Sequence, residues 1–196
     1  MSNGVDIGRR RFLTNSTAVV GAVGGAFAAA PFAIAWLPTA RAKALGAPIE
    51  IDISKIEPGM KLTAEWRRKP VWIVSRTPEA LKDLKSVESK LRDPASDKDQ
   101  QPEYAKNQGR SRKPELLVLV GICTHLGCAP TYFEPGKPPT PGEDWKGGFF
   151  CPCHGSRFDL AGRVFQAVPA PLNLEVPPHY YADDNTIVVG LDQGDA

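Results

Sequence analysis

The N-terminal part of the chain carries an apolar run that no charged side chain interrupts. After Arg11 the next charged residue is Arg41, so the 29 positions 12–40 are all uncharged. At ~1.5 Å of rise per residue, a helix over residues 17–37 is long enough to cross the ~30 Å hydrocarbon layer of a bilayer. The pattern therefore predicts a single transmembrane helix at residues 17–37.

Three consecutive arginines precede this apolar run. The segment Arg9–Leu13 reads Arg-Arg-Arg-Phe-Leu and matches a twin-arginine export signal. One alternative is a signal peptide cleaved near residues 40–42, which read Ala-Arg-Ala, but the run exceeds the ~7–15 apolar residues of such signals. We therefore favour a retained anchor, with residues 1–16 as a cytoplasmic twin-arginine segment, in agreement with the positive-inside rule.

The anchor is followed by a segment that has no hydrophobic face. Residues 38–48 are rich in alanine, with two prolines and one glycine, a composition typical of a tether. We expect a flexible hinge here, although a short surface linker without a mechanical role has the same composition.

The rest of the chain, residues 49–196, has the pattern of a mainly β head domain. Residues 49–53 alternate apolar and polar side chains, as does a strand with one buried face. Further strands are predicted at residues 61–67, 71–76, 115–120, 164–168 and 186–191. Pro78 opens a segment with helical spacing, which predicts one short helix at residues 79–91. The charged stretch 93–113 is expected to be an exposed loop.

Composition narrows this picture in two ways. The chain has 18 glycines and 19 prolines among 196 residues, which favours turns and short strands over a helical bundle. Its formal net charge is only +2, and there is no basic stripe interleaved with aromatic residues, so nucleic acid is not an expected partner. All four cysteines lie between positions 123 and 153, and two of the three histidines lie beside them. This clustering indicates a site.

The clustered residues form two short motifs. Residues 123–128 read Cys-Thr-His-Leu-Gly-Cys, and residues 151–156 read Cys-Pro-Cys-His-Gly-Ser. A structural zinc site prefers spacings such as Cys-x₂₋₄-Cys, for which Cys-x-Cys-His is awkward, and a scaffold of two disulfides gives the histidines no role. A third interpretation uses every residue: two cysteines and two histidines hold a 2Fe-2S cluster, and the remaining two cysteines pair. The spacing favours the cluster and leaves the other two interpretations, the zinc site and the two disulfides, open.

Together the two motifs resemble those of the Rieske iron–sulfur subunits of ubiquinol–cytochrome c reductase, the bacterial cytochrome bc complex. The resemblance extends to the export signal, the anchor and the linker, and it implies a β-sandwich head with an inserted cluster-binding subdomain formed by loops 123–128 and 151–156. The ligands it implies are Cys123 and Cys151 for the inner iron, and His125 and His154 for the outer iron. It further implies a disulfide between Cys128 and Cys153, which the Rieske domains of ring-hydroxylating dioxygenases lack.

The resemblance also assigns roles around the cluster. His154 is expected to bind the quinol and receive its proton, with Leu126 beside it at the exposed tip. Ser156 corresponds to a serine whose hydroxyl donates to a bridging sulfide. Phe158 stands where most relatives have a tyrosine that donates to a ligand cysteine, so we expect a lower reduction potential.

Two further residues are not explained by the motifs: one differs from the family pattern, and the other has no assigned role. Residues 168–171 read Val-Pro-Ala-Pro and resemble a Gly-Pro-Ala-Pro loop that covers the cluster. Val168 replaces the glycine, and a positive φ there would strain it. The third histidine, His179, is expected to be a surface or packing residue.

The function that the resemblance implies is electron transfer within a quinol–cytochrome c oxidoreductase, a translocase. The 2Fe-2S head would take an electron from quinol at cytochrome b and pass it to a c-type cytochrome, swinging on residues 38–48. Its partners would be those two subunits in a dimeric membrane complex, with the head in the periplasm of a bacterial inner membrane, where a disulfide is permitted. The alternative is the small Rieske subunit of a periplasmic oxidase such as arsenite oxidase.

Overall fold

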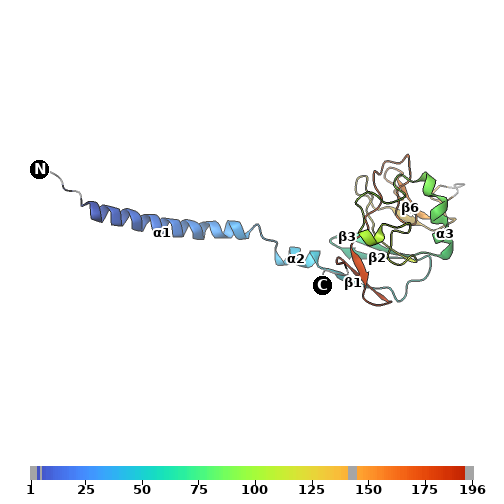
Figure 1. Cartoon of the computed structure of the whole chain (residues 1–196), viewed down its shortest axis with the longest axis horizontal. Coiled ribbons are helices and arrows are strands. Elements are labelled where there is room, and N and C mark those ends of the chain that lie inside the picture. The colour runs from blue at the N-terminus through green and yellow to red at the C-terminus, as the bar shows by residue number, and fades with distance from the viewer. Residues whose placement is uncertain (1–3, 5, 141–144, 193–196) are drawn as a thin grey trace. The chain divides into compact units, whose positions relative to one another are not determined.

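The chain divides into an N-terminal helical unit and a β-rich head. The structure, a computed structural model, describes residue 4 and residues 6–140 and 145–192 (Figure 1). Its two compact units are Met1–Ala44 and Leu45–Ala196, so the division falls within the segment predicted as a hinge, residues 38–48.

The N-terminal unit is dominated by helix α1, Ile7–Ile34. Asp6 caps it by accepting a hydrogen bond from the Arg9 N–H at 3.1 Å. The helix is long and apolar enough to span a membrane, and none of its side chains is buried. It begins ten residues before the predicted span at 17, so the twin-arginine motif is itself helical, and it ends three residues short of 37. A short helix α2, Ala40–Gly46, lies in the predicted hinge.

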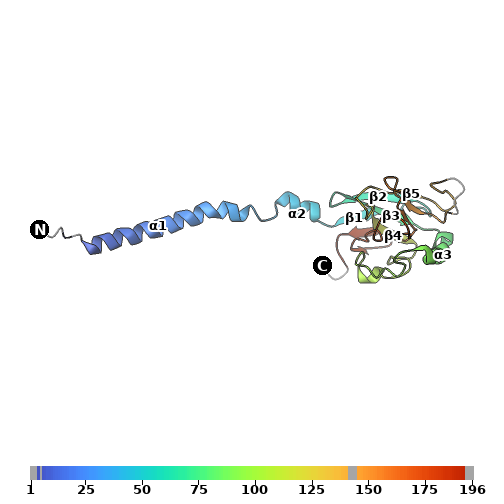
Figure 2. The same cartoon turned by 90° about the horizontal axis from the view of Figure 1, so that it is seen from above.

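Nine strands form three antiparallel sheets in the described part of the head (Figures 1 and 2). The first sheet has the order β1-β9-β8 and contains Ile49–Asp52, Thr186–Val189 and His179–Tyr181. The second has the order β2-β3-β4, with Lys61–Trp66, Lys69–Ser75 and Leu116–Val120. The third has the order β5-β6-β7, with Thr131–Phe133, Gly148–Phe150 and Arg157–Phe158. Because β5–β7 lie between β4 and β8 in sequence, the third sheet is an insertion into the other two, as predicted.

The β2-β3-β4 sheet is the middle layer of the head. Leu117 and Leu119 on β4 pack with the third sheet and the buried cysteines, whereas Leu116 and Val118 pack with the first sheet. Alternate side chains of a strand point to opposite faces, so a strand between two layers needs apolar residues at every position. This explains the unbroken apolar sequence of β4.

Helix α3, Pro78–Ser86, lies on the side of the head opposite β1 (Figures 1 and 2). Thr77 caps it by accepting the Ala80 N–H at 3.2 Å. The helix is shorter than the predicted 79–91, because the chain turns after Ser86 into a 3₁₀ turn, Glu88–Lys90. A second 3₁₀ turn, Glu103–Ala105, follows.

Two sequence-based predictions for the head are wrong. Residues 164–168 do not form a strand: Val164 and Phe165 make only isolated bridges, and the chain then turns at Ala167, which has φ of 57°. Residues 93–113 are not an exposed loop, because several of their side chains are buried, among them Arg110, which is 0% exposed. Its guanidinium donates to main-chain carbonyls, which a pattern based on polarity cannot anticipate.

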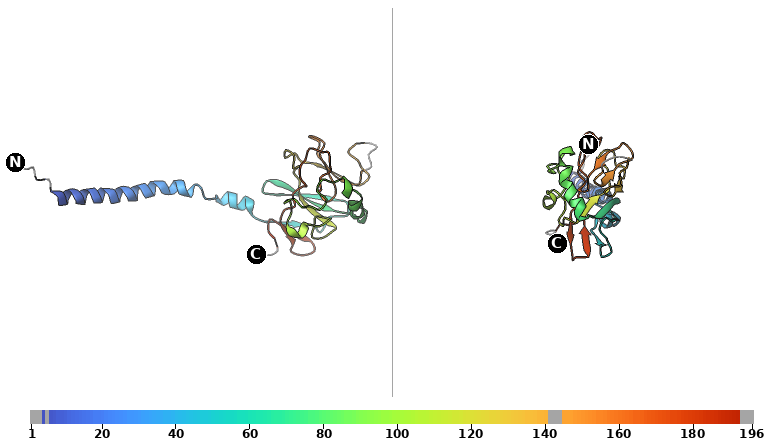
Figure 3. Two further views of the ribbon diagram at one scale, coloured as in Figure 1. Left: turned by 45° about the horizontal axis from the view of Figure 1, so that its top comes forward. Right: turned by 90° about the vertical axis from the view of Figure 1, so that its right-hand side faces the viewer.

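His179 is a packing residue at the start of β8, whose hairpin with β9 is seen in Figure 3. Its side chain is fully buried, and Nδ1 lies 2.8 Å from the Pro177 carbonyl. Since a carbonyl can only accept, Nδ1 carries the proton of the neutral ring. Burial lowers the pKa of His179 from 6.5 to about 4.

We expect His179 to make the head less stable in acid. The folded state holds the ring neutral, so its stabilisation is complete above the unfolded pKa of 6.5 and is lost as pH falls toward the folded value of about 4. The loss amounts to about 3 kcal/mol of unfolding free energy. His179→Gln should lose less stability than wild type between pH 7 and pH 4, measured by denaturant titration. Equal losses in both proteins would contradict this assignment.

Candidate metal centre

The first cysteine–histidine motif folds into a tight loop after β4. In residues 123–128 the Cys123 N–H donates to the Cys128 carbonyl at 2.8 Å, and the Gly127 N–H donates to the Cys123 carbonyl at 3.0 Å. Gly127 has φ of 82°, a conformation that glycine adopts without strain. The loop therefore closes on itself.

The second motif forms a loop with the same hydrogen bonds. In residues 151–156 the Cys151 N–H donates to the Ser156 carbonyl at 2.8 Å, and the Gly155 N–H donates to the Cys151 carbonyl at 2.9 Å. Gly155 has φ of 74°. Each loop thus offers a cysteine at its first position and a glycine at its fifth, which gives the two loops equivalent backbones.

A disulfide joins the two loops. It links Cys128 with Cys153, the pairing that the resemblance implied. Cys128 is half-buried and Cys153 is exposed, so the bridge lies on the outer side of the loops. The sulfur atoms of Cys128, Cys151 and Cys153 lie within 4.8 Å of one another, but the disulfide leaves only Cys151 among them able to bind a metal.

The other two cysteines are free and lie deep in the head. Cys123 and Cys151 are each 2% exposed and belong to the core cluster beneath the loops. Their thiols contact each other. Burial raises the pKa of the Cys123 thiol, while the nearby main-chain N–H of His125 and the Ser156 hydroxyl act in the opposite direction. The alternative of two disulfides is wrong, since this pair stays unbonded.

The two motif histidines lie together at the surface. The ring centroids of His125 and His154 are 4.8 Å apart, and the rings are nearly perpendicular at 87°. His125 is half-buried and His154 is exposed. Leu126, the residue after His125, is 71% exposed, more than any other large apolar side chain in the described part of the head.

This arrangement fits a Rieske 2Fe-2S cluster. Two thiols lie at the bottom of the site and two imidazoles at its rim, so one iron would have sulfur ligands on the buried side and the other would have nitrogen ligands on the exposed side. The assignment of Cys123, His125, Cys151 and His154 as ligands remains a prediction, with which this geometry is consistent.

The residues expected to tune the cluster lie against this site. Ser156 is fully buried, and its hydroxyl oxygen accepts the Ala170 N–H at 3.0 Å. Phe158 is fully buried in the same core cluster as the two free cysteines. Val168 does not have the positive φ that would strain it, whereas the preceding residue, Ala167, has φ of 57°. Sequence reasoning also missed Thr124, whose hydroxyl donates to the Leu172 carbonyl at 2.6 Å, because neither residue type signals a contact across 48 positions.

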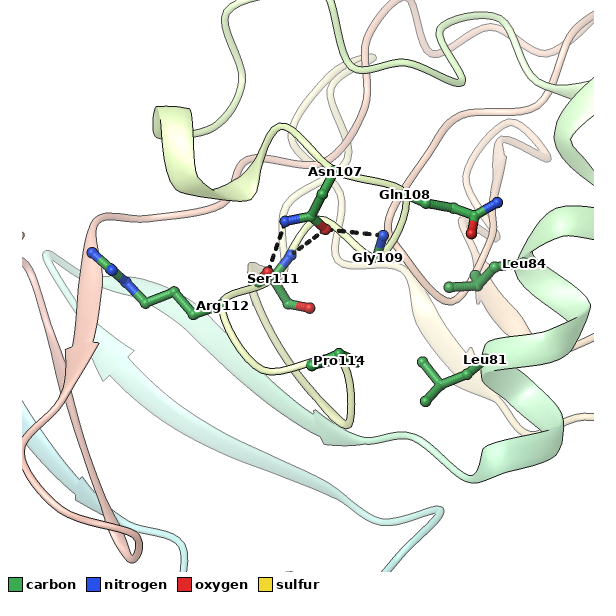
Figure 4. A pocket seen from close by; sticks show the side chains of 8 residues that line it. All are labelled: Leu81, Leu84, Asn107, Gln108, Gly109, Ser111, Arg112 and Pro114. Carbon is green, nitrogen blue, oxygen red and sulfur yellow. Dashed lines mark hydrogen bonds between the residues drawn. The ribbon is translucent and has the colours of Figure 1, made fainter.

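A pocket of about 380 Å³ lies elsewhere, between α3 and residues 107–114 (Figure 4). Asn107 orders its wall by accepting hydrogen bonds from the N–H groups of Gly109 and Ser111. Arg112, its one charged lining residue, donates to the His179 carbonyl and pairs with Asp192. These contacts are structural, and no predicted site residue lines this pocket.

Comparison with protein families gives two matches. Residues 104–178 match the model of the Rieske [2Fe-2S] domain. Residues 1–37 match the model described as the ubiquitinol-cytochrome C reductase Fe-S subunit TAT signal, which confirms the export signal. The apolar helix and the export signal together fit a membrane-anchored subunit.

Individual relatives agree along the whole chain. The chain is 58% identical over 195 residues to the ubiquinol-cytochrome c reductase iron-sulfur subunit of Allochromatium vinosum, covering 100% of this chain and 94% of that one. It is 43% identical over 188 residues to the subunit of the same name from Rhodospirillum rubrum, covering 95% and 94%. A solved chain of a hyperthermophilic respiratory Complex III matches with 26% identity and a TM-score of 0.50, covering 89% and 98%. The chain therefore belongs to the family of Rieske iron–sulfur subunits of ubiquinol–cytochrome c reductase.

Proposed function

We propose that this chain is the electron-transfer subunit of a quinol–cytochrome c oxidoreductase. It takes an electron from quinol at the cytochrome b site, together with a proton, and passes the electron to a c-type cytochrome. The observation that carries the proposal is the site itself: two surface imidazoles over two buried thiols, on disulfide-linked loops. The 58% identity to a ubiquinol-cytochrome c reductase subunit supports the same substrate class.

Each residue of the site has its own role in the proposed electron transfer. A bound 2Fe-2S cluster with two histidine ligands supplies a one-electron acceptor of higher potential than an all-cysteine cluster. His154, the more exposed of the two imidazoles, offers its ring nitrogen to the quinol hydroxyl and takes up the proton. Leu126 provides an apolar contact beside it for the quinol pocket of cytochrome b. The buried cysteines and the covering chain keep water from the inner side.

The same proposal places the protein in the bacterial inner membrane, with the head in the periplasm. Helix α1 serves as the anchor, and residues 38–48 serve as the hinge between anchor and head. The partners are cytochrome b and a c-type cytochrome subunit in a dimeric complex. The disulfide supports an oxidising location for the head.

Purification of the native membrane complex tests this function. We expect b-type and c-type haems to co-purify with the chain, and the complex to reduce cytochrome c with quinol. The second candidate, the small subunit of a periplasmic oxidase such as arsenite oxidase, predicts molybdenum in the complex instead. Molybdenum without haem b would refute the proposal.

Leu126→Glu should lower quinol oxidation by tenfold or more, because a carboxylate is costly to bury in an apolar quinol pocket. The EPR signal of the reduced cluster should remain, since the side chain is 71% exposed and supports no core packing. Met60→Glu is the matched control, because Met60 is the other large apolar side chain of the described head that is well exposed, at 48%. Equal turnover in both variants would contradict the contact.

Phe158→Tyr should raise the reduction potential. The new hydroxyl would lie in the core cluster that contains both free cysteines, where donation to a ligand sulfur stabilises the more negatively charged reduced state. Redox titration followed by EPR measures the shift. Phe150→Tyr, on the neighbouring strand β6 and half-buried, controls for adding a hydroxyl to the subdomain. If the potential of Phe158→Tyr does not rise, the tuning role is wrong.

A further inference from the structure

Residues 164–174 form a cover loop whose inner side is attached to both cluster-binding loops. The Ala170 N–H donates to the Ser156 hydroxyl oxygen at 3.0 Å, and the Thr124 hydroxyl donates to the Leu172 carbonyl at 2.6 Å. Ala170 is fully buried, so its bond to Ser156 is shielded from water. The position of the cover loop therefore determines what surrounds the Ser156 hydroxyl.

The outer side of the cover loop is attached to a different part of the chain, residues 90–93, which we call the clamp segment. Gln166 makes two bonds to it: its main-chain N–H donates to the Lys90 carbonyl and its side-chain Nε2 to the Leu91 carbonyl, both at 2.9 Å. Arg92 of the clamp segment donates two hydrogen bonds to the cover loop. Its main-chain N–H donates to the Val164 carbonyl at 2.9 Å, and its guanidinium donates to the Val168 carbonyl at 3.0 Å.

The far end of the cover loop is held to the clamp segment as well. Asn173 is fully buried; its Oδ1 accepts the Val164 N–H at 2.9 Å, and its Nδ2 donates to the Asp93 carbonyl at 3.0 Å. Both ends of the loop are thus tied to one short segment that begins at the last residue of the 3₁₀ turn after α3.

The backbone between these ties is in a conformation that alanine disfavours. Ala167 has φ of 57°, in the left-handed region where Cβ approaches the following carbonyl. A strained residue persists only where its surroundings fix it. The bonds made by Gln166 and by the Val168 carbonyl flank Ala167 directly, so the clamp segment supplies that constraint.

The constraint reaches the site through Ser156. Its oxygen accepts from Ala170, and its hydroxyl lies close enough to the Cys123 sulfur to favour the thiolate form. In such a chain each hydrogen bond polarises the next, so a well-placed Ala170 N–H strengthens donation to the sulfur. Donation to a ligand sulfur favours the reduced cluster.

We propose that Arg92 and Gln166 are positioning residues for the cluster: they hold the cover loop closed, and through Ala170 and Ser156 they raise its reduction potential. The inference takes the ligation by Cys123 and Cys151 proposed above as its basis. Arg92 lies outside the matched Rieske domain, residues 104–178, so the domain is tuned by a segment that is not part of it.

The test uses the full-length chain with its cluster, as wild type and as Arg92→Met, Gln166→Met and Arg68→Met. The first two remove a clamp donor and keep an aliphatic chain. Arg68→Met removes an exposed arginine in the turn between β2 and β3 and is the matched control. Hydrogen exchange of the peptide containing Ala170 and the potential from EPR-monitored titration are both measured.

We expect Arg92→Met and Gln166→Met to speed exchange in the Ala170 peptide about fivefold, as loss of one net hydrogen bond implies. Exchange in β4 should not change, and the potential should fall in both variants. Arg68→Met should change neither quantity. A purely structural role would lower thermal stability and speed exchange throughout the head without moving the potential, and that result would overturn the proposal.

A mutant cycle with Ser156 tests the route. Ser156→Ala alone should lower the potential, and adding Arg92→Met should lower it no further, since the path through the hydroxyl is already lost. Additive decreases would overturn the route through Ser156. Absence of the Rieske EPR signal from wild type would instead refute the ligand assignment, while the exchange measurement would still report whether the clamp holds the loop.

Discussion

The head depends on three arginine side chains that are buried together beneath the cluster-binding subdomain. Arg76, Arg110 and Arg163 are at most 3% exposed; the first two bind residues 159–163, the turn that follows β7, and Arg163 lies within that turn. The pairs are Arg76 with the Leu160 carbonyl (3.1 Å), Arg110 with the Ala161 carbonyl (3.1 Å) and Arg163 with the Asp159 carboxylate (2.8 Å). Main-chain carbonyls buried in a turn need donors, and guanidinium groups supply several in a fixed geometry.

Burying these guanidinium charges costs free energy, so the turn must offer them specific hydrogen-bond acceptors. Burial lowers the pKa of Arg76 and of Arg110 to about 10, so both remain protonated at neutral pH and must be compensated inside the protein. Asp159 is the buried carboxylate among the described residues, and the remaining donors go mostly to carbonyl oxygens. Since β7 has only two residues, little chain separates this turn from the second cluster-binding loop. The arginines thereby fix one wall of the site to β3, to α3 and to residues 93–113.

The sequence predicted what local chemistry determines and missed what long-range polar contacts determine. The cluster loops were found because their ligands, glycines and cysteines lie within six positions of each other. Strand β4 was found because burial on both faces requires an unbroken apolar run. Residues 93–113 were misjudged because Arg110 is buried by hydrogen bonds, and polarity alone indicates exposure. Strands of two or three residues, such as β6 and β7, are too short for a period of two to be recognised.

Different interactions hold the two cluster-binding loops together on the exposed and on the buried side of the site. This has a consequence for how the subunit would carry an electron. On the exposed side a covalent bond between Cys128 and Cys153 joins the two loops. On the buried side the core cluster and the arginine-bound turn do so. A site fixed on both sides presents His154 and Leu126 to any partner in one arrangement. We infer that the head moves between an electron donor and an acceptor as one body. The movement then takes place in the linker, where the chain divides between Ala44 and Leu45.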